Sequence, residues 1–76
     1  MNLKVRNALR AIDDARSRLR YILMNEYPIG TSIEWQRGTA QVAEGLVLEY
    51  APEGNRVKVR NTFSGKEFWI YARDIV

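Results

Sequence analysis

The sequence contains no cysteine and no histidine among its 76 residues. Without cysteine, neither a disulfide framework nor a thiolate metal site can form, so packing alone must hold the fold together, which favours a reducing compartment. Without histidine, the chain lacks the commonest general base, the commonest transition-metal ligand and the usual switch near neutral pH. These absences exclude most hydrolase and zinc chemistry, and we expect no catalytic residue, no metal and no cofactor.

Long apolar runs are missing as well. Charged residues interrupt the N-terminal segment before it reaches the length of a secretory signal, and no stretch approaches the roughly 18 apolar residues of a membrane span. The five glycines stand singly rather than in a phosphate-binding loop, and the glutamates lack the spacing of a calcium or magnesium site. We therefore expect an intracellular, cytoplasmic protein that does not bind membranes.

The composition is that of one small folded domain. Chains this short bury only about 60% of their unfolded surface, which leaves no apolar material for a second core. Hydrophobic residues make up 46% of the chain and charged residues 28%, and the two Trp, four Tyr and two Phe supply large core side chains. The sequence therefore predicts a single domain over residues 1–76.

The first third of the chain has the periodicity of an amphipathic helix. Apolar residues recur at steps of three and four, with two more beside them: Val5, Ala8, Ile12, Ala15, Leu19 and Ile22, flanked by Leu9 and Leu23. This spacing predicts a helix over residues 3–26. Asn2 is suited to cap its first turn, and Pro28 ends it by pushing Tyr27 out of the α region.

After Gly30 the period of the apolar residues changes to two, and turn residues appear every eight to twelve positions, which is typical of short strands in an all-β unit. We expect strands at 31–36, 40–50, 55–61, 66–71 and 74–76. The predicted fold class is α+β, mainly β. A long N-terminal helix, residues 1–27, is expected to pack on a five-stranded antiparallel barrel, residues 28–76.

The second of these strands is apolar on both faces. Val47 faces one way, and Leu46, Leu48 and Tyr50 form a second apolar row. Such a row needs a cover, and the apolar side of the helix is the only one available. We therefore expect the row to lie beneath three residues of the helix: Leu19, Ile22 and Leu23.

The helix is longer than the barrel that should cover it. A helix of this length spans roughly 35 Å, whereas a compact barrel of this size is only about 25 Å across. The overhang must fray, bind a partner or pair with a second copy, and its spacing suits a helix seam. Its apolar residues are the candidate seam of a homodimer: Val5, Ala8, Leu9 and Ile12.

The segment from Pro28 to Val76 resembles a known barrel family. It contains an initial Gly-x-x-Ile-x-Trp strand, a Gly-x-Val strand, an alternating Val-x-Val strand, an aromatic strand and a terminal Ala-Arg-Asp-Ile-Val. Together these resemble the five-stranded Src-homology-3-like barrel in its Tudor and KOW-like versions. The resemblance implies the fold alone, because this fold hosts unrelated functions.

A second resemblance concerns an enzyme family on the same fold. The segment Gly45–Ala72, with Pro-Glu-Gly at 52–54 and Phe-Trp-Ile-Tyr at 68–71, is similar to the plasmid-encoded trimethoprim-resistant dihydrofolate reductases. That family carries Val-Gln-Ile-Tyr at the second place, so the last two residues match, while Trp69 replaces a ligand-contacting glutamine. The resemblance implies an NADPH-dependent reductase as one alternative function.

The net charge of +3 lies entirely in the helical segment. Residues 1–26 hold six cations against three anions, whereas residues 27–76 hold six of each. At 100° per residue, three arginines fall within about 80° of one another opposite the apolar residues and could lie along a phosphate backbone: Arg6, Arg10 and Arg20. The alternative is an ordinary solvated face with i,i+4 pairs of Asp14 with Arg18 or Arg10.

A second cationic surface is expected on the barrel. Alternation along the third strand places three cations on its outer face: Arg56, Lys58 and Arg60. The next strand adds Trp69 and Tyr71, and the hairpin adds Phe63 and Lys66. Cations and aromatics would then interleave as in platforms for single-stranded nucleic acid. The alternative is that the charges only keep a half-buried strand soluble, while the aromatics fill the interface with the helix.

Functions from different classes remain open. The leading hypothesis is a non-catalytic interaction module, of the kind expected for a small phage or mobile-element accessory protein, that binds a larger protein assembly. Nucleic-acid binding through the Arg-rich helix and the basic strand is the first alternative, and the reductase-like enzyme is the second. An aromatic cage for a methylated cation is a further alternative, drawn from four residues: Trp35, Tyr50, Phe63 and Tyr71.

Overall fold

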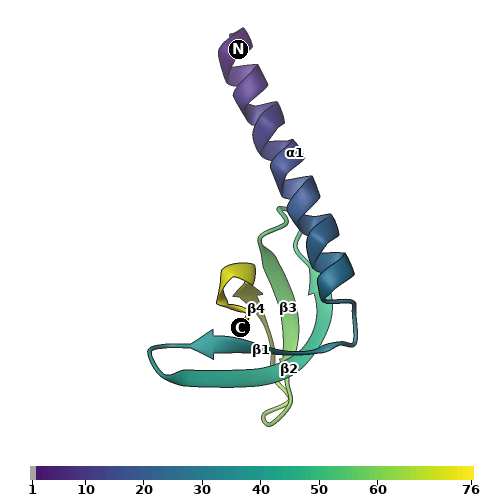
Figure 1. Cartoon of the computed structure of the whole chain (residues 1–76), viewed down its shortest axis with the longest axis vertical. Helices are drawn as coiled ribbons and strands as arrows, with labels where there is room; N and C mark the ends of the chain where they lie inside the picture. Colours follow the sequence, from purple (N-terminus) through teal and green to yellow (C-terminus); the bar gives the residue numbers. More distant parts are fainter. Residues whose placement is uncertain (1) are drawn as a thin grey trace.

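The computed structural model describes residues 2–76 as one helix followed by an antiparallel sheet (Figure 1). The elements are α1 (Leu3–Glu26), β1 (Ser32–Arg37), β2 (Gln41–Tyr50), β3 (Arg56–Asn61), β4 (Glu67–Tyr71) and the short 3-10 helix η1 (Ala72–Asp74). The predicted α+β class is confirmed. The first four predicted strands agree with β1–β4 to within one residue at each end.

α1 begins and ends where the sequence predicts. The Asn2 side chain accepts a hydrogen bond from the Val5 backbone N–H at 2.9 Å, which satisfies one of the free N–H groups of the first turn. At the other end the Tyr27 backbone turns to φ −130° ahead of Pro28, while its N–H still donates to the Leu23 carbonyl at 2.8 Å. Asn2 and Pro28 therefore act as local signals that fix the length of the helix.

The four strands form one sheet in chain order, β1-β2-β3-β4, with every neighbouring pair antiparallel. Alternate residues of each strand point to the same face, and these inward residues form the core together with one helical residue: Leu23, Ile33, Trp35, Ala43, Val47, Val57, Val59 and Ile70. Trp35 is only 1% exposed and packs edge to face with Phe68, with ring centroids 5.8 Å apart. The inner face of the sheet is thus filled largely by the sheet's own side chains.

The predicted fifth strand, residues 74–76, is wrong. The chain forms η1 after β4, so only the last two residues remain for pairing. A single bridge joins Ile75 to Trp35, and the Val76 N–H donates to the Glu34 carbonyl at 2.9 Å. The described residues therefore contain four strands in one sheet, and the C-terminal end of the chain is joined to β1 at one point.

The predicted apolar row of Leu46, Leu48 and Tyr50 is also wrong, because β2 contains a bulge. The pairing of β2 with β3 is regular up to Val47. The next residue of β2, Leu48, has no partner in β3, and pairing resumes at Glu49. Beyond this bulge the alternation is reversed, so Leu46 lies on the outer face while Tyr50 packs against the core. The Tyr50 hydroxyl donates a hydrogen bond to the Tyr27 carbonyl at 2.6 Å, and burial raises the pKa of this hydroxyl. The bulge thus lets Tyr50 anchor the end of the helix.

The expectation that the sheet covers the apolar side of α1 is wrong. Among the residues of α1, Leu23 alone is buried, while Leu19 and Ile22 are 36% and 56% exposed. Figure 1 shows α1 rising from one end of the sheet as an arm, and the molecule measures 49 × 26 × 18 Å. Since the sheet fills its own inner face, it has no second apolar face to offer to the helix.

The turn between β2 and β3 supports the lower half of α1. Gly54 in this turn has φ +85°, and a Cβ placed there would come within 2.3 Å of the Arg16 backbone oxygen. Turn and helix backbone therefore touch directly at this point. The residues of α1 before Arg16 extend beyond this turn, and all of their side chains are exposed. They form the overhang that the sequence predicts.

Candidate functional site

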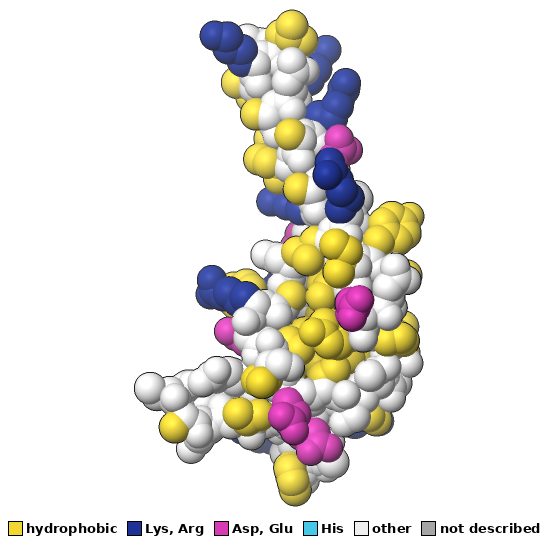
Figure 2. Space-filling view, in the orientation of Figure 1, with side chains coloured by type: hydrophobic (Ala, Val, Ile, Leu, Met, Phe, Trp, Pro, Cys, Tyr) yellow, Lys and Arg dark blue, Asp and Glu magenta, His cyan; other side chains and the backbone are white. Residues whose placement is uncertain are grey.

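The overhang carries exposed apolar side chains along one side of α1. We define this apolar stripe by seven residues: Val5, Ala8, Leu9, Ile12, Ala15, Leu19 and Ile22. The four predicted seam residues lie at its free end, and the three large ones, Val5, Leu9 and Ile12, are each 45–46% exposed. Figure 2 shows hydrophobic side chains following the helix from its free end to its junction with the sheet. The helix itself aligns them, because residues three and four apart share a face.

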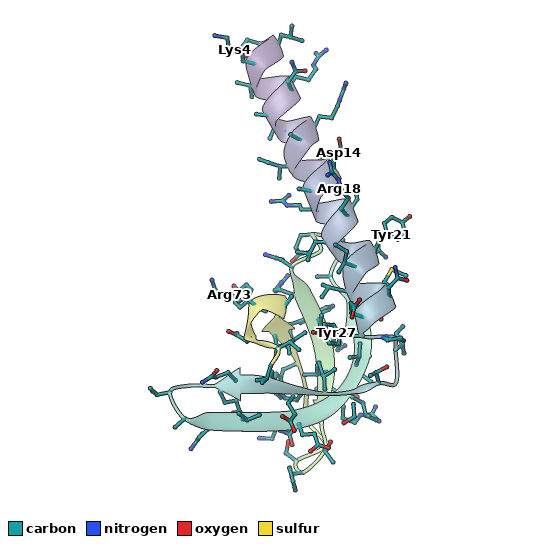
Figure 3. The ribbon with its side chains drawn as sticks, in the orientation of Figure 1. Lys4, Asp14, Arg18, Tyr21, Tyr27 and Arg73 are labelled. Carbon is teal, nitrogen blue, oxygen red and sulfur yellow. The ribbon has the colours of Figure 1, made fainter. Side chains whose placement is uncertain are left out.

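At its lower end the apolar stripe runs into an open groove of about 520 Å³ between α1 and the end of the sheet. This foot groove is lined by Leu19, Ile22, Leu23, Glu26, Tyr27, Asn55, Tyr71, Ala72 and Arg73. Figure 3 shows Tyr27 beneath the end of α1 and Arg73 projecting from η1. The walls are mostly apolar, with one anion from the helix, Glu26, and one cation from η1, Arg73. Such a groove can accept the apolar side of another segment.

The predicted arginine face of α1 is exposed. Arg6 and Arg10 lie on the side of the helix away from the apolar stripe, whereas Arg20 lies beside Leu9 at the edge of the stripe. Arg6, Arg10 and Arg20 all project into solvent. The two ion pairs formed within residues 2–76 lie in the sheet and its β2–β3 turn, so the predicted pairs of Asp14 with Arg18 or Arg10 are not formed. Asp14 and Arg18 do project from the same side of α1 (Figure 3). The charge of the helix is therefore presented without compensation from ion pairs in the described chain.

The outer face of the β3–β4 hairpin brings together four of the predicted binding residues. The register pairs Lys58 with Trp69 and Arg56 with Tyr71. The Arg56 guanidinium carbon lies 5.6 Å and the Lys58 Nζ 6.0 Å from the centroid of the Trp69 ring, within the range of cation–π attraction. Trp69 is 38% and Tyr71 48% exposed. We call these four residues the β3–β4 face.

Two of the three cations in the predicted basic row are paired with glutamates. The Arg56 guanidinium pairs with Glu53, and the Arg60 guanidinium donates to the Glu67 carboxylate at 2.6 and 3.0 Å. Hydrogen bonds lower the pKa of Glu53; the largest effect comes from the backbone N–H of Glu53 itself and the next from the Arg56 side chain. The hydrogen bond from Arg60 lowers the pKa of Glu67 in the same way. Lys58 is the one cation of the row without such a pair in the described chain. The row therefore carries less net charge than its sequence suggests.

Three predicted members of the aromatic and cationic clusters lie elsewhere. Lys66 lies in the turn after β3, where its carbonyl accepts a hydrogen bond from the Asn61 N–H at 2.8 Å. Phe63, in the same turn, is 88% exposed and borders a depression that Val42 also lines. Since Trp35 is buried in the core, the four residues of the predicted aromatic cage do not converge.

Sequence reasoning missed Arg73 as part of this surface. Its guanidinium carbon lies 4.9 Å from the centroid of the Tyr71 ring, which is on the β3–β4 face. Arg73 reaches this place because η1 turns the chain immediately after β4. The pairing of Glu67 with Arg60 was also missed, although the hairpin register places the two residues opposite each other.

Neither a metal site in the described chain nor a similarity to a known protein indicates a function. Among residues 2–76 no three acidic side chains lie close enough to hold a metal ion, and no helix has the length and apolarity needed to cross a membrane. No known protein family, curated protein or solved structure matches this chain. What the chain binds therefore has to be inferred from the apolar stripe, the foot groove and the β3–β4 face.

Proposed function

We propose that this protein is a non-catalytic interaction module that binds a helix of a protein partner along the apolar stripe of α1. The observation that carries the proposal is the exposure of α1, since only Leu23 of its 24 residues is buried. Isolated helices are marginal in water, and most helical stability in proteins comes from packing an amphipathic face. A helix that leaves such a face bare is suited to recognise another amphipathic helix.

The form of the apolar stripe favours a helical partner. Its residues recur at steps of three and four, which is the spacing of side chains that interlock between two helices. Ala8 and Ala15 stand between larger residues, so a second helix can approach closely and place its own side chains above them. The foot groove continues the stripe and would receive the end of that helix.

We propose further that the sheet is a small Src-homology-3-like barrel that serves as a scaffold. Four antiparallel strands in chain order followed by a 3-10 helix support this assignment. The bridge between Trp35 and Ile75 brings residues 75–76 back to β1, which is the direction of chain needed to close such a barrel. Because the sheet's own side chains fill the core, most of α1 stays available to a partner.

Capture experiments with the tagged full chain test the proposed function. Ile12→Glu places a charge in the middle of the apolar stripe, whereas Ser17→Glu adds the same charge on the opposite side of α1. We expect the wild type and Ser17→Glu to retain the same protein from a cell extract, identified by mass spectrometry, and Ile12→Glu to lose it. Equal capture by all three chains would rule out docking along the stripe.

A second candidate function is the binding of single-stranded nucleic acid on the β3–β4 face. The observation that favours it is the exposed Trp69 ring beside Arg56 and Lys58. Aromatic rings flanked by cations form stacking platforms for bases, and each stacked base contributes about 1–3 kcal/mol. Arg73 over Tyr71 extends the same surface.

Fluorescence anisotropy with a labelled oligonucleotide at two salt concentrations tests this second function. We expect Trp69→Ala and Lys58→Ala to weaken binding, while Lys66→Ala, which removes the same charge in the turn, leaves it nearly unchanged. Loss of the Lys58 charge should also reduce the slope of log affinity against log salt by about one. The absence of any signal with micromolar protein at about 50 mM salt would exclude this function.

A further inference from the structure

We infer that the helix bound along the apolar stripe is α1 of a second copy of this chain, packed antiparallel, with its N-terminal half in the foot groove. The inference rests on the proposed function, because it names the partner of the same surface. It predicts a symmetric dimer in which each copy supplies one stripe and one groove. The two sheets then lie at opposite ends of a two-helix seam.

The sizes of the stripe residues match in an antiparallel pair. With the two-fold axis passing between Asp13 and Asp14, stripe residues meet across the seam in symmetric layers. The distinct layers are Val5 with the partner's Ile22, Ala8 with the partner's Leu19, and Ile12 with the partner's Ala15. Each alanine then faces a large side chain, which fills the space between the helices to the density of a protein interior.

A parallel pair of the same helices would pack poorly. Each residue would then face its own copy, so Ala8 would meet the partner's Ala8 and leave space that no side chain fills. Glu26, four residues after Ile22 on the same side of the helix, would also face an identical carboxylate, and like charges there are destabilising. In the antiparallel alignment Glu26 lies beyond the last layer, so neither problem arises.

The charges beside the stripe are also compatible with the antiparallel pair. Four cations flank the stripe: Lys4, Arg16, Arg18 and Arg20. Across the antiparallel seam the residue nearest in height to each of them is uncharged: the partner's Leu23 for Lys4, the partner's Ala11 for Arg16, the partner's Leu9 for Arg18 and the partner's Asn7 for Arg20. The aliphatic stems of the arginines can cover the edge of the seam while their charged heads stay in water.

The foot groove lies where an antiparallel partner would place its free end. Leu23 is buried against the sheet, and Leu9 lies on the same side of α1, about 40° around the helix from it. In a symmetric antiparallel pair, the same flank of each helix lies on the same side of the seam, so the Leu9 flank of one copy lies beside the Leu23 flank of the other. The partner's Leu9 therefore faces the sheet of this copy near the height of Leu19, where Tyr71 and Ala72 form the opposite wall of the groove.

Cysteine cross-linking tests the alignment, because the natural chain contains no cysteine. A mixture of Ala8→Cys and Leu19→Cys chains should form a disulfide-linked pair under mild oxidation, since these two positions face each other across the seam. Either variant alone should stay unlinked, because the two copies of each position are then about 16 Å apart along the helix axis. In sedimentation equilibrium we expect a wild-type dimer that Ile12→Glu converts to a monomer and Ser17→Glu does not.

The outcomes separate this inference from the proposed function. Efficient linking of Leu19→Cys to itself would reveal a parallel pair and overturn the alignment, as would a dimer in which the mixed cysteine chains fail to link. A monomeric wild type at every protein concentration would overturn the second copy as the partner. Capture of a different protein that is lost in Ile12→Glu would then still support the proposed function. If Ile12→Glu changes neither the oligomeric state nor capture, both are wrong.

Discussion

Tyr50 links the sheet to the end of α1 through the hydrogen bond from its hydroxyl to the Tyr27 carbonyl. Tyr50→Phe keeps the ring against the core and removes the donor. We therefore expect the free energy of unfolding at neutral pH to fall by about 0.5–1.5 kcal/mol. Urea denaturation of both chains measures this difference, and an unchanged stability would show that the hydrogen bond contributes nothing to the fold.

The same hydroxyl predicts a pH dependence. Burial raises the pKa of Tyr50 above its ordinary value of 10.0, so the folded state favours the protonated hydroxyl. Its contribution is complete below about pH 10 and is lost as the pH rises through the folded-state pKa. The difference in unfolding free energy between the wild type and Tyr50→Phe should therefore shrink as the pH rises from about 10 to about 12. A difference that stays constant over this range would contradict the assignment.

At the scale of the elements, the contact between the β2–β3 turn and α1 depends on Gly54. Gly54→Ala adds a methyl group that would overlap the Arg16 carbonyl, in addition to the strain of φ +85°. Gly38→Ala is the matched control, because Gly38 has φ +66° with no atom near the added methyl group. We expect the control to lose about 1–2 kcal/mol of stability from strain alone, and Gly54→Ala to lose a further 1–3 kcal/mol, roughly, from the overlap. Thermal unfolding of the two variants compares them, and equal losses would mean that turn and helix do not touch.

Most element boundaries can be predicted from the sequence because they depend on local rules. Asn2 and Pro28 fix the ends of α1, and alternation with intervening turns fixes the strands. The bulge at Leu48 could not be predicted, because the apolar residues on both sides of it are compatible with either face of the strand. The position of Arg73 over Tyr71 depends on η1, which no spacing of residues signals.

At the scale of the whole molecule, the sequence of the helix does not determine what covers its apolar stripe. An apolar stripe predicts that something covers it, but its periodicity is the same whether the cover is the chain's own sheet or another helix. The inner face of the sheet decides the outcome, because it is already filled by Trp35 and the valines of β2 and β3 and cannot cover the stripe. The stripe and its predicted seam residues therefore remain exposed in the single chain, and the candidate site lies where covering by the sheet was expected.

Amide hydrogen exchange along α1 in the full chain tests most directly whether a second helix covers the apolar stripe in solution. Every side chain of residues 5–15 is exposed in the single chain, so without a partner these amides should exchange nearly as fast as those of an isolated helix. We predict that they are protected in the wild type, increasingly so at higher protein concentration, and that Ile12→Glu removes this protection. Fast exchange of residues 5–15 at every concentration, while the amides of Val57 and Val59 in the core stay protected, would contradict a covered stripe.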